Sequence, residues 1–151
     1  MSKLLESWRA AAGKPFGKWL FSKSVASRVP YTGTIGARIE ELEPRRSRVT
    51  LRDRRRVRNH LDSIHAVALM NLGELASGLA LLAALDDDRR AILVKFETSF
   101  VKKARGTLTA TGRVDESVDL RADGEFTVSA DLEDEAGDRV AAVTATWRVS
   151  A

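Results

Sequence analysis

A long apolar segment, Ile64 to Leu85, constrains the fold of this chain more than any other feature. Apolar residues cover nearly every side of the segment when it is drawn as a helix, so we expect a helix that is buried over most of its surface. Asp62 or Ser63 is expected to cap its start. The acids Asp86–Asp88 are expected just past its end, because acidic residues in the last turn oppose the helix dipole. The segment therefore predicts one long helix at the centre of the core.

One carboxylate, Glu74, interrupts the apolar surface of this predicted helix. A buried carboxylate is costly unless it is paired, hydrogen-bonded or protonated. At about 100° per residue, Val67, Asn71, Glu74 and Gly78 share one stripe of the helix, with Ser77 beside it. Such a stripe requires a partner or a cavity. Two interpretations are open: a buried polar network that fixes the helix, or a functional site.

Two short amphipathic helices are predicted before the first strand. Residues 4–12 and 16–26 have helical periodicity, and the sequence GKPFG separates them. Pro30 ends the helical pattern, because the residue before a proline avoids the helical region. From Tyr31 the side chains alternate between apolar and polar, so we expect extended chain from this point.

The remaining segments predict β-strands. Residues 48–52 alternate before the long helix, and four β-branched or alternating segments follow it, at residues 89–103, 106–114, 124–134 and 138–150. The gaps ARG, RADG and EAGD between the last four have the length of hairpin turns. The order predicts an α+β fold in which a curved antiparallel sheet of about six strands wraps around one long helix. Residues 1–30 are expected to form an N-terminal helical extension of the main domain, residues 31–151.

Composition excludes several classes of function. The chain has no cysteine, which excludes disulfides and zinc–thiolate sites, and with 2 histidines no catalytic metal is expected. A phosphate-binding loop, a dinucleotide fingerprint and a Ser-His-Asp order are missing, and we expect no cofactor. The N-terminus lacks the unbroken apolar core of a secretory signal. Glu74 at the centre of the apolar segment would cost roughly 2.5–3.5 kcal/mol in lipid, so we expect no membrane span. The absence of cysteine fits the cytoplasmic location that we expect.

Positive charge is concentrated in the first part of the chain. Residues 1–60 contain 15 Lys and Arg against 5 Asp and Glu, whereas residues 61–151 contain 10 against 16. The densest run is PRRSRVTLRDRRRVR, Pro44 to Arg58. It indicates a partner that carries phosphate, either a nucleic acid or a small molecule with a nucleotide tail. No aromatic residues interleave with the run to stack bases, which counts against single-stranded nucleic acid.

The polar residues before the helix and Glu74 cannot meet within one chain. His65 and Glu74 are nine residues apart, which is about 13.5 Å along a helix and half a turn in azimuth. Asn59 lies further back still. If these groups act on one reacting centre, they must come from two chains whose long helices pack antiparallel. Chemistry at this motif therefore predicts a homodimer, with a tetramer left open.

The sequence NHLDSIHAVALMNLGE, in this order of strands and helix, resembles the hotdog-fold thioesterases. It is most similar to the phenylacetyl-CoA thioesterase type and to an uncharacterised hotdog subfamily. The pattern of that type is an Asn six residues before a His, two small residues after the His, and an acid nine residues after it. Asn59, His65 and Glu74 match this spacing, and Ala66 and Val67 replace the usual Gly-Gly pair. The segments KPFGKWLF, PYTGTIGARI and RRRVRNH extend the resemblance over nearly the whole chain.

The resemblance implies a hotdog domain at residues 31–151 that hydrolyses a thioester of coenzyme A or an acyl carrier protein. The backbone amides of Ala66 and Val67 would stabilise the oxyanion. Glu74 of the other subunit would be the general base, Asn59 would orient water or the carbonyl, and His65 would shape the helix start. The other residues expected to bind substrate are Asn71 and Ser77 in the pocket and Arg54, Arg55, Arg56 and Arg58 at the coenzyme phosphates.

Three alternatives remain open. A hotdog protein that binds an acyl-CoA or acyl carrier protein without hydrolysis is favoured by Ala66 and Val67, whose side chains restrict approach to the backbone. A hydroxyacyl dehydratase is indicated by the fourteen-residue spacing of His60 and Glu74, although that class places prolines between its catalytic residues and none occurs here. A nucleic-acid binder that uses the arginine run is the third.

Overall fold

The computed structural model describes residues 1–151. Its elements follow in chain order as α1 (Lys3–Ala12), α2 (Gly17–Arg28), α3 (Pro30–Gly33), β1 (Arg38–Glu43), β2 (Arg46–Leu51), a 3-10 turn η1 (Arg55–Val57), α4 (Ala66–Leu82), β3 (Arg90–Phe100), β4 (Leu108–Val114), β5 (Gly124–Glu133) and β6 (Arg139–Ser150). The predicted α+β class is confirmed: two strands precede the one long helix, and four strands follow it.

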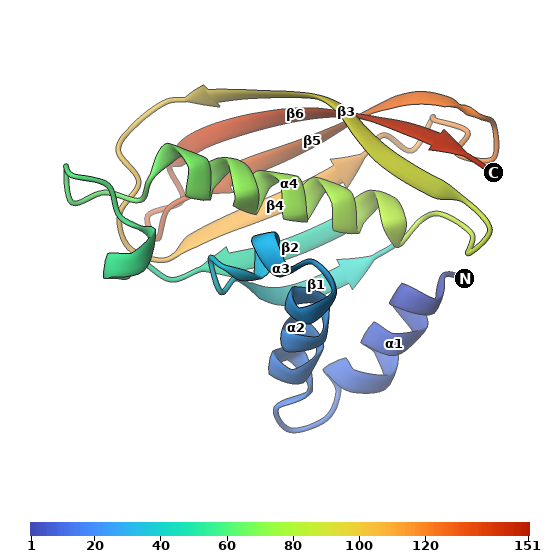
Figure 1. Ribbon diagram of the computed structural model, residues 1–151, viewed down its shortest axis with the longest axis horizontal. Coiled ribbons are helices and arrows are strands. Elements are labelled where there is room, and N and C mark those ends of the chain that lie inside the picture. Colours follow the sequence, from blue (N-terminus) through green and yellow to red (C-terminus); the bar gives the residue numbers. More distant parts are fainter.

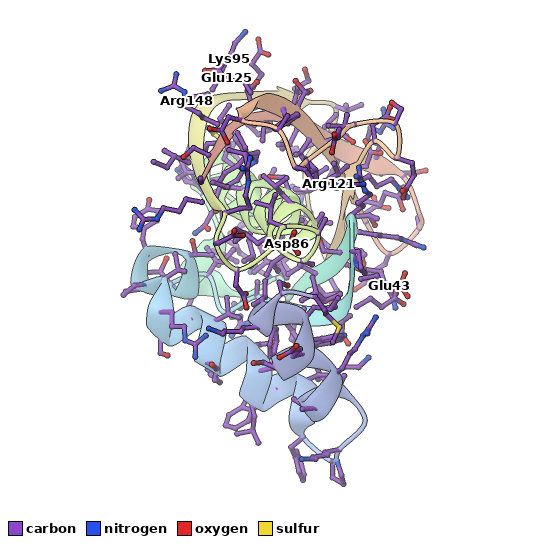
Figure 2. All side chains as sticks on the ribbon, turned by 90° about the vertical axis from the view of Figure 1, so that its right-hand side faces the viewer. Glu43, Asp86, Lys95, Arg121, Glu125 and Arg148 are labelled. Atoms are coloured by element: carbon purple, nitrogen blue, oxygen red, sulfur yellow. The ribbon has the colours of Figure 1, made fainter.

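The six strands form one antiparallel sheet in the order β1-β2-β4-β5-β6-β3. The helix α4 lies across one face of the sheet (Figure 1), and a view along α4 shows the sheet curling around it (Figure 2). The hairpin between β5 and β6 falls at the predicted EAGD turn. By contrast, β3 pairs with β6 and forms an edge of the sheet, so the predicted hairpin at ARG is wrong. The connection from β4 to β5 is also longer than the predicted RADG turn.

The core lies between α4 and the inner face of the sheet. In β4 the alternation holds as predicted, since Leu108 and Ala110 are fully buried. Leu72 and Ala76 of α4 are equally inaccessible. A fully buried leucine side chain contributes about 1.5–3 kcal/mol of transfer free energy. The long helix therefore forms as predicted because most of its surface is covered by strands.

The helix α4 approaches the sheet closely at Gly112 of β4. The Ser47 hydroxyl donates a hydrogen bond to the Ala76 carbonyl at 2.6 Å, and a Cβ at position 112 would collide with that carbonyl group. The absence of a side chain at Gly112 thus allows the backbone of α4 to rest directly on β4. This contact fixes the position of α4 at Ala76, which is two residues from Glu74.

The N-terminal helices pack against the β1 side of the sheet (Figure 1). The rings of Trp8 and Phe21 meet edge to face with their centroids 5.2 Å apart, and both residues belong to the same apolar core as α4. The Ser22 hydroxyl accepts a hydrogen bond from the Ile39 amide at 2.9 Å, which ties α2 to β1. The two predicted helices are confirmed, and the domain boundary at residue 30 stays a prediction.

Two local predictions are wrong. Residues 30–33 form the short helix α3 instead of extended chain, because Pro30 occupies a first-turn position, where a missing amide proton costs nothing. The cap of α4 is His65 and not Asp62 or Ser63. Asp62 adopts a left-handed conformation with φ 51° and belongs to the preceding turn.

Candidate active site

Glu74 lies in a shallow depression on the side of α4 that the sheet leaves uncovered. The depression has a volume of about 390 Å³, and α3, α4 and β3 form its walls. Seven other residues line the depression and most of them are apolar: Tyr31, Thr32, Val67, Met70, Asn71, Leu93 and Phe96. The helix positions Glu74 there because the opposite side of the same turn carries Leu72 and Ala76 into the core. Val67, Asn71 and Glu74 of the predicted stripe thus face this depression, whereas Ser77 and Gly78 are buried.

The Glu74 carboxylate has neither an ion pair nor a hydrogen bond within the chain. Partial burial raises the pKa of this carboxyl group above the ordinary value of 4.5, because desolvation disfavours the charged form. Asn71 lies in the same depression, and its amide nitrogen is 3.5 Å from the Tyr31 carbonyl oxygen. A partly buried carboxylate with a raised pKa and no partner is a stronger base than a solvated one and is free to contact a ligand.

The start of α4 holds one occupied and one free amide. The His65 Nδ1 atom accepts a hydrogen bond from the Val67 amide at 3.0 Å and so caps the helix. The Ala66 amide has no acceptor within the chain. Of the two amides expected to stabilise an oxyanion, only that of Ala66 is therefore available while His65 keeps this position.

Asn59 lies in a different depression from Glu74. This second depression has a volume of about 270 Å³ and extends from Asn59 and Ala66 to residues 100–104, at the end of β3 and just after it. The Asn59 side-chain oxygen accepts hydrogen bonds from the Leu61 amide at 2.9 Å and from the Ser63 hydroxyl at 3.1 Å. Asn59 thus holds the loop before α4, and a single chain does not bring it to Glu74.

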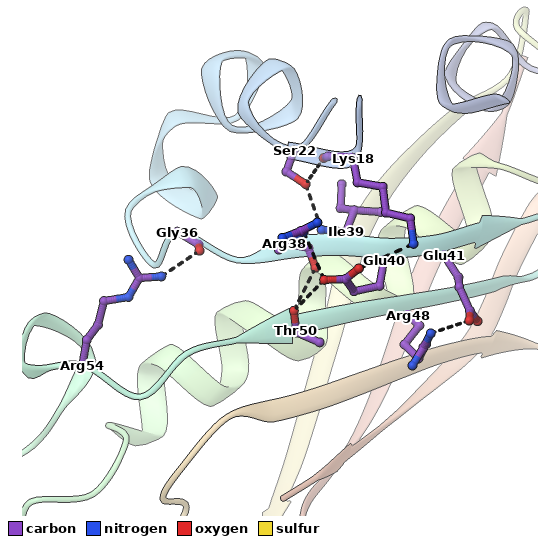
Figure 3. Close-up of polar contacts among 10 residues, drawn as sticks. All are labelled: Lys18, Ser22, Gly36, Arg38, Ile39, Glu40, Glu41, Arg48, Thr50 and Arg54. Carbon is purple, nitrogen blue, oxygen red and sulfur yellow. Dashed lines mark hydrogen bonds and ion pairs between the residues drawn. The ribbon is translucent and has the colours of Figure 1, made fainter. Parts of the chain in front are cut away.

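The four arginines expected to bind phosphate fall into two groups. Arg54 and Arg56 line a cleft of about 580 Å³ between α2 and the strands β1 and β2, and the Arg54 guanidinium donates to the Gly36 carbonyl at 3.1 Å (Figure 3). Arg58 instead pairs with Asp53 at 2.7 Å, which lowers the pKa of that carboxyl group. Arg55 is exposed on η1 and does not line this cleft.

Ser77 does not line the depression around Glu74. Its side chain has no exposed surface, and its hydroxyl donates to the Glu74 carbonyl oxygen at 3.0 Å. This hydrogen bond lies within α4. Ser77 therefore satisfies its own polar group inside the helix and is not presented to a ligand in this structure.

Several residues at the two cavities escaped the sequence analysis. Around Glu74 these are Tyr31, Leu93 and Phe96, which come from segments far apart in sequence. In the cleft they are Lys23, Arg38 and Arg52. The available signal for the arginines was their spacing of two, because residues 52, 54 and 56 would share one side of an extended chain; in the structure Arg56 belongs to η1. No local pattern marks Phe96 as a neighbour of Glu74.

The structure contains no group of three or more His, Asp or Glu side chains placed to hold a metal ion. None of its helices combines the length and the apolar character needed to cross a membrane.

A curved six-stranded antiparallel sheet around one long helix is the hotdog fold, which the chain shares with solved structures of thioesterase-like proteins. The chain belongs to the family described as domain of unknown function DUF4442, whose model matches residues 17–149. No curated protein matches the chain.

Solved structures of similar fold include proteins named as thioesterases. A structural-genomics protein is 26% identical, with a TM-score of 0.85 over 97% of each chain. A Pseudomonas aeruginosa protein of unknown function, named a probable thioesterase, is 26% identical, with a TM-score of 0.72 over 82% of this chain and 89% of its own. A thioesterase family protein from Silicibacter pomeroyi is 20% identical, with a TM-score of 0.73 over 85% of this chain and 94% of its own, and it shows the common fold.

Proposed function

We propose that this protein is an acyl thioester hydrolase that acts as a homodimer, with Glu74 as its general base. The observation that carries the proposal is the Glu74 carboxylate, which lies without a partner in a largely apolar depression of about 390 Å³. A carboxylate held this way costs folding free energy unless a charged or hydrogen-bonding partner contacts it. Titratable groups in such surroundings are typical of functional sites. The hotdog proteins of similar structure that are named as thioesterases support the same reaction class.

A second copy of the chain is expected along β3. This strand has 11 residues, forms an edge of the sheet, and exposes apolar side chains, with Ile92 67% and Val94 40% accessible. A long edge strand with apolar side chains is a template for pairing with another strand. An antiparallel pairing of β3 with its copy also places two α4 helices side by side. This arrangement would bring the helix start of one chain towards Glu74 of the other.

The proposed reaction is hydrolysis of a thioester by water. Glu74 removes a proton from the water molecule as its oxygen attacks the thioester carbonyl carbon. The Ala66 amide of the other chain donates to the oxygen on which negative charge develops, and the positive end of the α4 dipole adds to this stabilisation. The carbon–sulfur bond then breaks, the proton held by Glu74 passes to the thiolate, and a carboxylic acid and a free thiol leave.

The neighbouring residues have supporting roles in this proposal. Asn59 holds the loop before α4 and would orient the carbonyl or the water with its amide group. His65 caps the helix through the Val67 amide, so the Val67 amide becomes a second oxyanion donor only if the His65 side chain turns away. Asn71 would contact the acyl group or the attacking water from the same depression.

Binding without hydrolysis is the second candidate function. Two observations favour it: Ala66 and Val67 carry side chains where the thioesterase pattern has glycines, and the Val67 amide is already occupied by His65. With one free amide, stabilisation of an oxyanion is weaker, and loss of one such donor costs about 100- to 1000-fold in rate. A protein of this kind would bind the acyl thioester tightly and release it intact.

A panel of acyl-CoA and acyl carrier protein thioesters separates the two functions through release of free thiol. We expect hydrolysis by the native protein and a loss of about 100-fold or more in Glu74→Gln, because the amide is not a general base. Glu43→Gln is the matched control, since Glu43 is exposed at the end of β1 (Figure 2) and does not line the depression. Thermal unfolding checks that both variants fold. Hydrolysis at the native rate in Glu74→Gln would refute the role of Glu74, whereas binding without hydrolysis would support the second candidate.

A further inference from the structure

A cleft rich in positive charge lies beside the depression that contains Glu74. It is bounded by α2, by the segment between α3 and β1, and by the end of β2 (Figure 3). Five cationic residues line it, namely Lys23, Arg38, Arg52, Arg54 and Arg56, against one acid, Glu40. The single acid is already engaged, because it pairs with Arg38 at 3.1 Å and with Lys18 at 3.6 Å.

Two guanidinium groups converge in this cleft without a counterion from the chain. Arg54 and Arg56 both reach Gly36, where a Cβ would lie 3.3 Å from one Arg54 nitrogen and would collide with Arg56. The backbone at Gly36 has φ 64°, which favours glycine and leaves room for both side chains. Neither arginine forms an ion pair with a carboxylate. Like charges brought this close repel each other unless an anion lies between or beside them.

Arg54 has unused hydrogen-bonding capacity. Its Nε atom is buried and has no partner, although one terminal nitrogen donates to the Gly36 carbonyl at 3.1 Å. Burial, followed by the charges of Arg56 and Arg52, lowers the pKa of the Arg54 guanidinium. An anion with several oxygens would satisfy the unpaired donor and offset the repulsion. Phosphate groups match guanidinium geometry in this way.

An aromatic side chain lies at the mouth of the same cleft. Trp19 of α2 is 49% exposed, and the Lys23 ammonium lies 5.8 Å from the centre of its ring. Trp19 also lines a neighbouring apolar depression together with Phe16 and Leu20. An exposed indole beside a phosphate site provides a surface on which a nucleobase can stack, because every base has an aromatic face.

We propose that this cleft binds the phosphate groups of a nucleotide, with Arg54 and Arg56 as the main contacts and Trp19 against the base. The proposal rests on the proposed function in one respect. If the protein hydrolyses acyl thioesters, the nucleotide is the coenzyme A end of the substrate. The two cavities meet at α3, since Thr32 lines the depression that contains Glu74 and the next residue, Gly33, lines the cleft. The long pantetheine arm of coenzyme A joins its phosphates to its sulfur and is suited to cross that distance.

Calorimetric titration tests the site without turnover, with adenosine 3′,5′-bisphosphate, adenosine and coenzyme A as probes. We expect the two phosphorylated probes to bind, with affinity falling as salt rises, and adenosine to bind much more weakly. The double variant Arg54→Ala/Arg56→Ala should bind the bisphosphate about 100-fold more weakly, at about tenfold for each charged hydrogen-bonding group. The double variant Arg121→Ala/Arg148→Ala removes the same charge from positions outside the cleft (Figure 2) and should bind normally.

Kinetics separates this inference from the proposed function. In the double variant Arg54→Ala/Arg56→Ala, KM should rise for an acyl-CoA and stay unchanged for an acyl-pantetheine, which lacks the nucleotide. Glu74→Gln should keep native affinity for the bisphosphate while losing hydrolysis. The inference is overturned if the arginine double variant binds the bisphosphate as the native protein does, or if adenosine binds equally well. Much tighter binding of a single-stranded oligonucleotide than of the bisphosphate also overturns it, because the cleft would then be part of a nucleic-acid surface.

Discussion

The close contact between α4 and β4 makes Gly112 a position where one methyl group should disturb both the fold and the site. A Cβ at residue 112 would lie 2.6 Å from the Ala76 carbonyl carbon and 2.9 Å from the Ser47 hydroxyl oxygen, whereas ordinary contacts are 3.4–4 Å. The atom that obstructs it is backbone, so no side chain can rotate away. In Gly112→Ala the helix must therefore lift from the sheet by roughly 1 Å, because a packed interior has no free space to absorb the overlap.

The expected cost follows from two contributions. Overpacking of a well-filled core costs about 1–3 kcal/mol. The hydrogen bond from Ser47 to the Ala76 carbonyl is 2.6 Å long, and its loss adds about 1 kcal/mol. The sum is about 2–4 kcal/mol in the free energy of unfolding, or a fall of roughly 4–16 °C in Tm for a chain of this size. Because Glu74 lies two residues from Ala76, a shift of this size should also lower the rate of hydrolysis about 10- to 100-fold.

Urea unfolding and calorimetry measure the stability change, and thiol release measures the rate. Gly124→Ala is the matched control, because it places the same methyl group on β5 with its nearest neighbour at an ordinary 3.6 Å. This control should stay within about 0.5 kcal/mol of the native protein. If Gly112→Ala is as stable as Gly124→Ala, then α4 does not rest on β4 as described, and the reasoning that links this contact to Glu74 fails.

Two further predictions concern Glu74 and the edge strand. Burial raises the pKa of Glu74 above 4.5, so the native state holds its proton more tightly than the unfolded state, and stability should rise as pH falls between the two pKa values. Glu74→Gln should thus be more stable than the native protein at pH 7, and this difference in stability should shrink as pH falls towards 4.5. Urea unfolding at several pH values measures the difference, and a constant difference would contradict the prediction. Ile92→Lys on β3 should yield a monomer by light scattering with little hydrolysis, because like charges would oppose each other along the paired edges. A fully active monomer would rule out a shared site.

The sequence predicts the fold well where a single pattern decides the structure. The buried side of α4 and the alternation of β4, β5 and β6 are visible in the residues themselves, because these elements bury one face against a common core. The position of β3 is different. Its residues predict a strand, but nothing in them indicates pairing with β6 at the edge instead of β4. Strand order depends on contacts between distant segments, which a local pattern does not contain.

The candidate site could be predicted only in part for the same reason. Glu74 is conspicuous in sequence because an acid inside an apolar helix is unusual. The residues around Glu74 are not conspicuous in sequence, since Tyr31 and Phe96 come from α3 and β3, far from Glu74 along the chain. The error at Tyr31 has a clear cause: Val29 and Pro30 do end α2, but the proline also starts a new helix. The arginine run predicts a phosphate-bearing partner, but the pattern does not reveal that Arg58 pairs with Asp53, five residues away.

The short helix α3 connects the two proposed sites physically. Its residues Tyr31 and Thr32 face Glu74, its last residue Gly33 faces the cationic cleft, and the Asn71 amide lies 3.5 Å from the Tyr31 carbonyl. A Cβ at Gly33 would lie 2.8 Å from the Ala26 carbonyl oxygen, so α3 is held tightly against α2. The N-terminal helices therefore do more than cover the β1 edge of the sheet. They hold α3 against α4, and in the proposed arrangement the thioester of a nucleotide bound in the cleft reaches the acid past this contact.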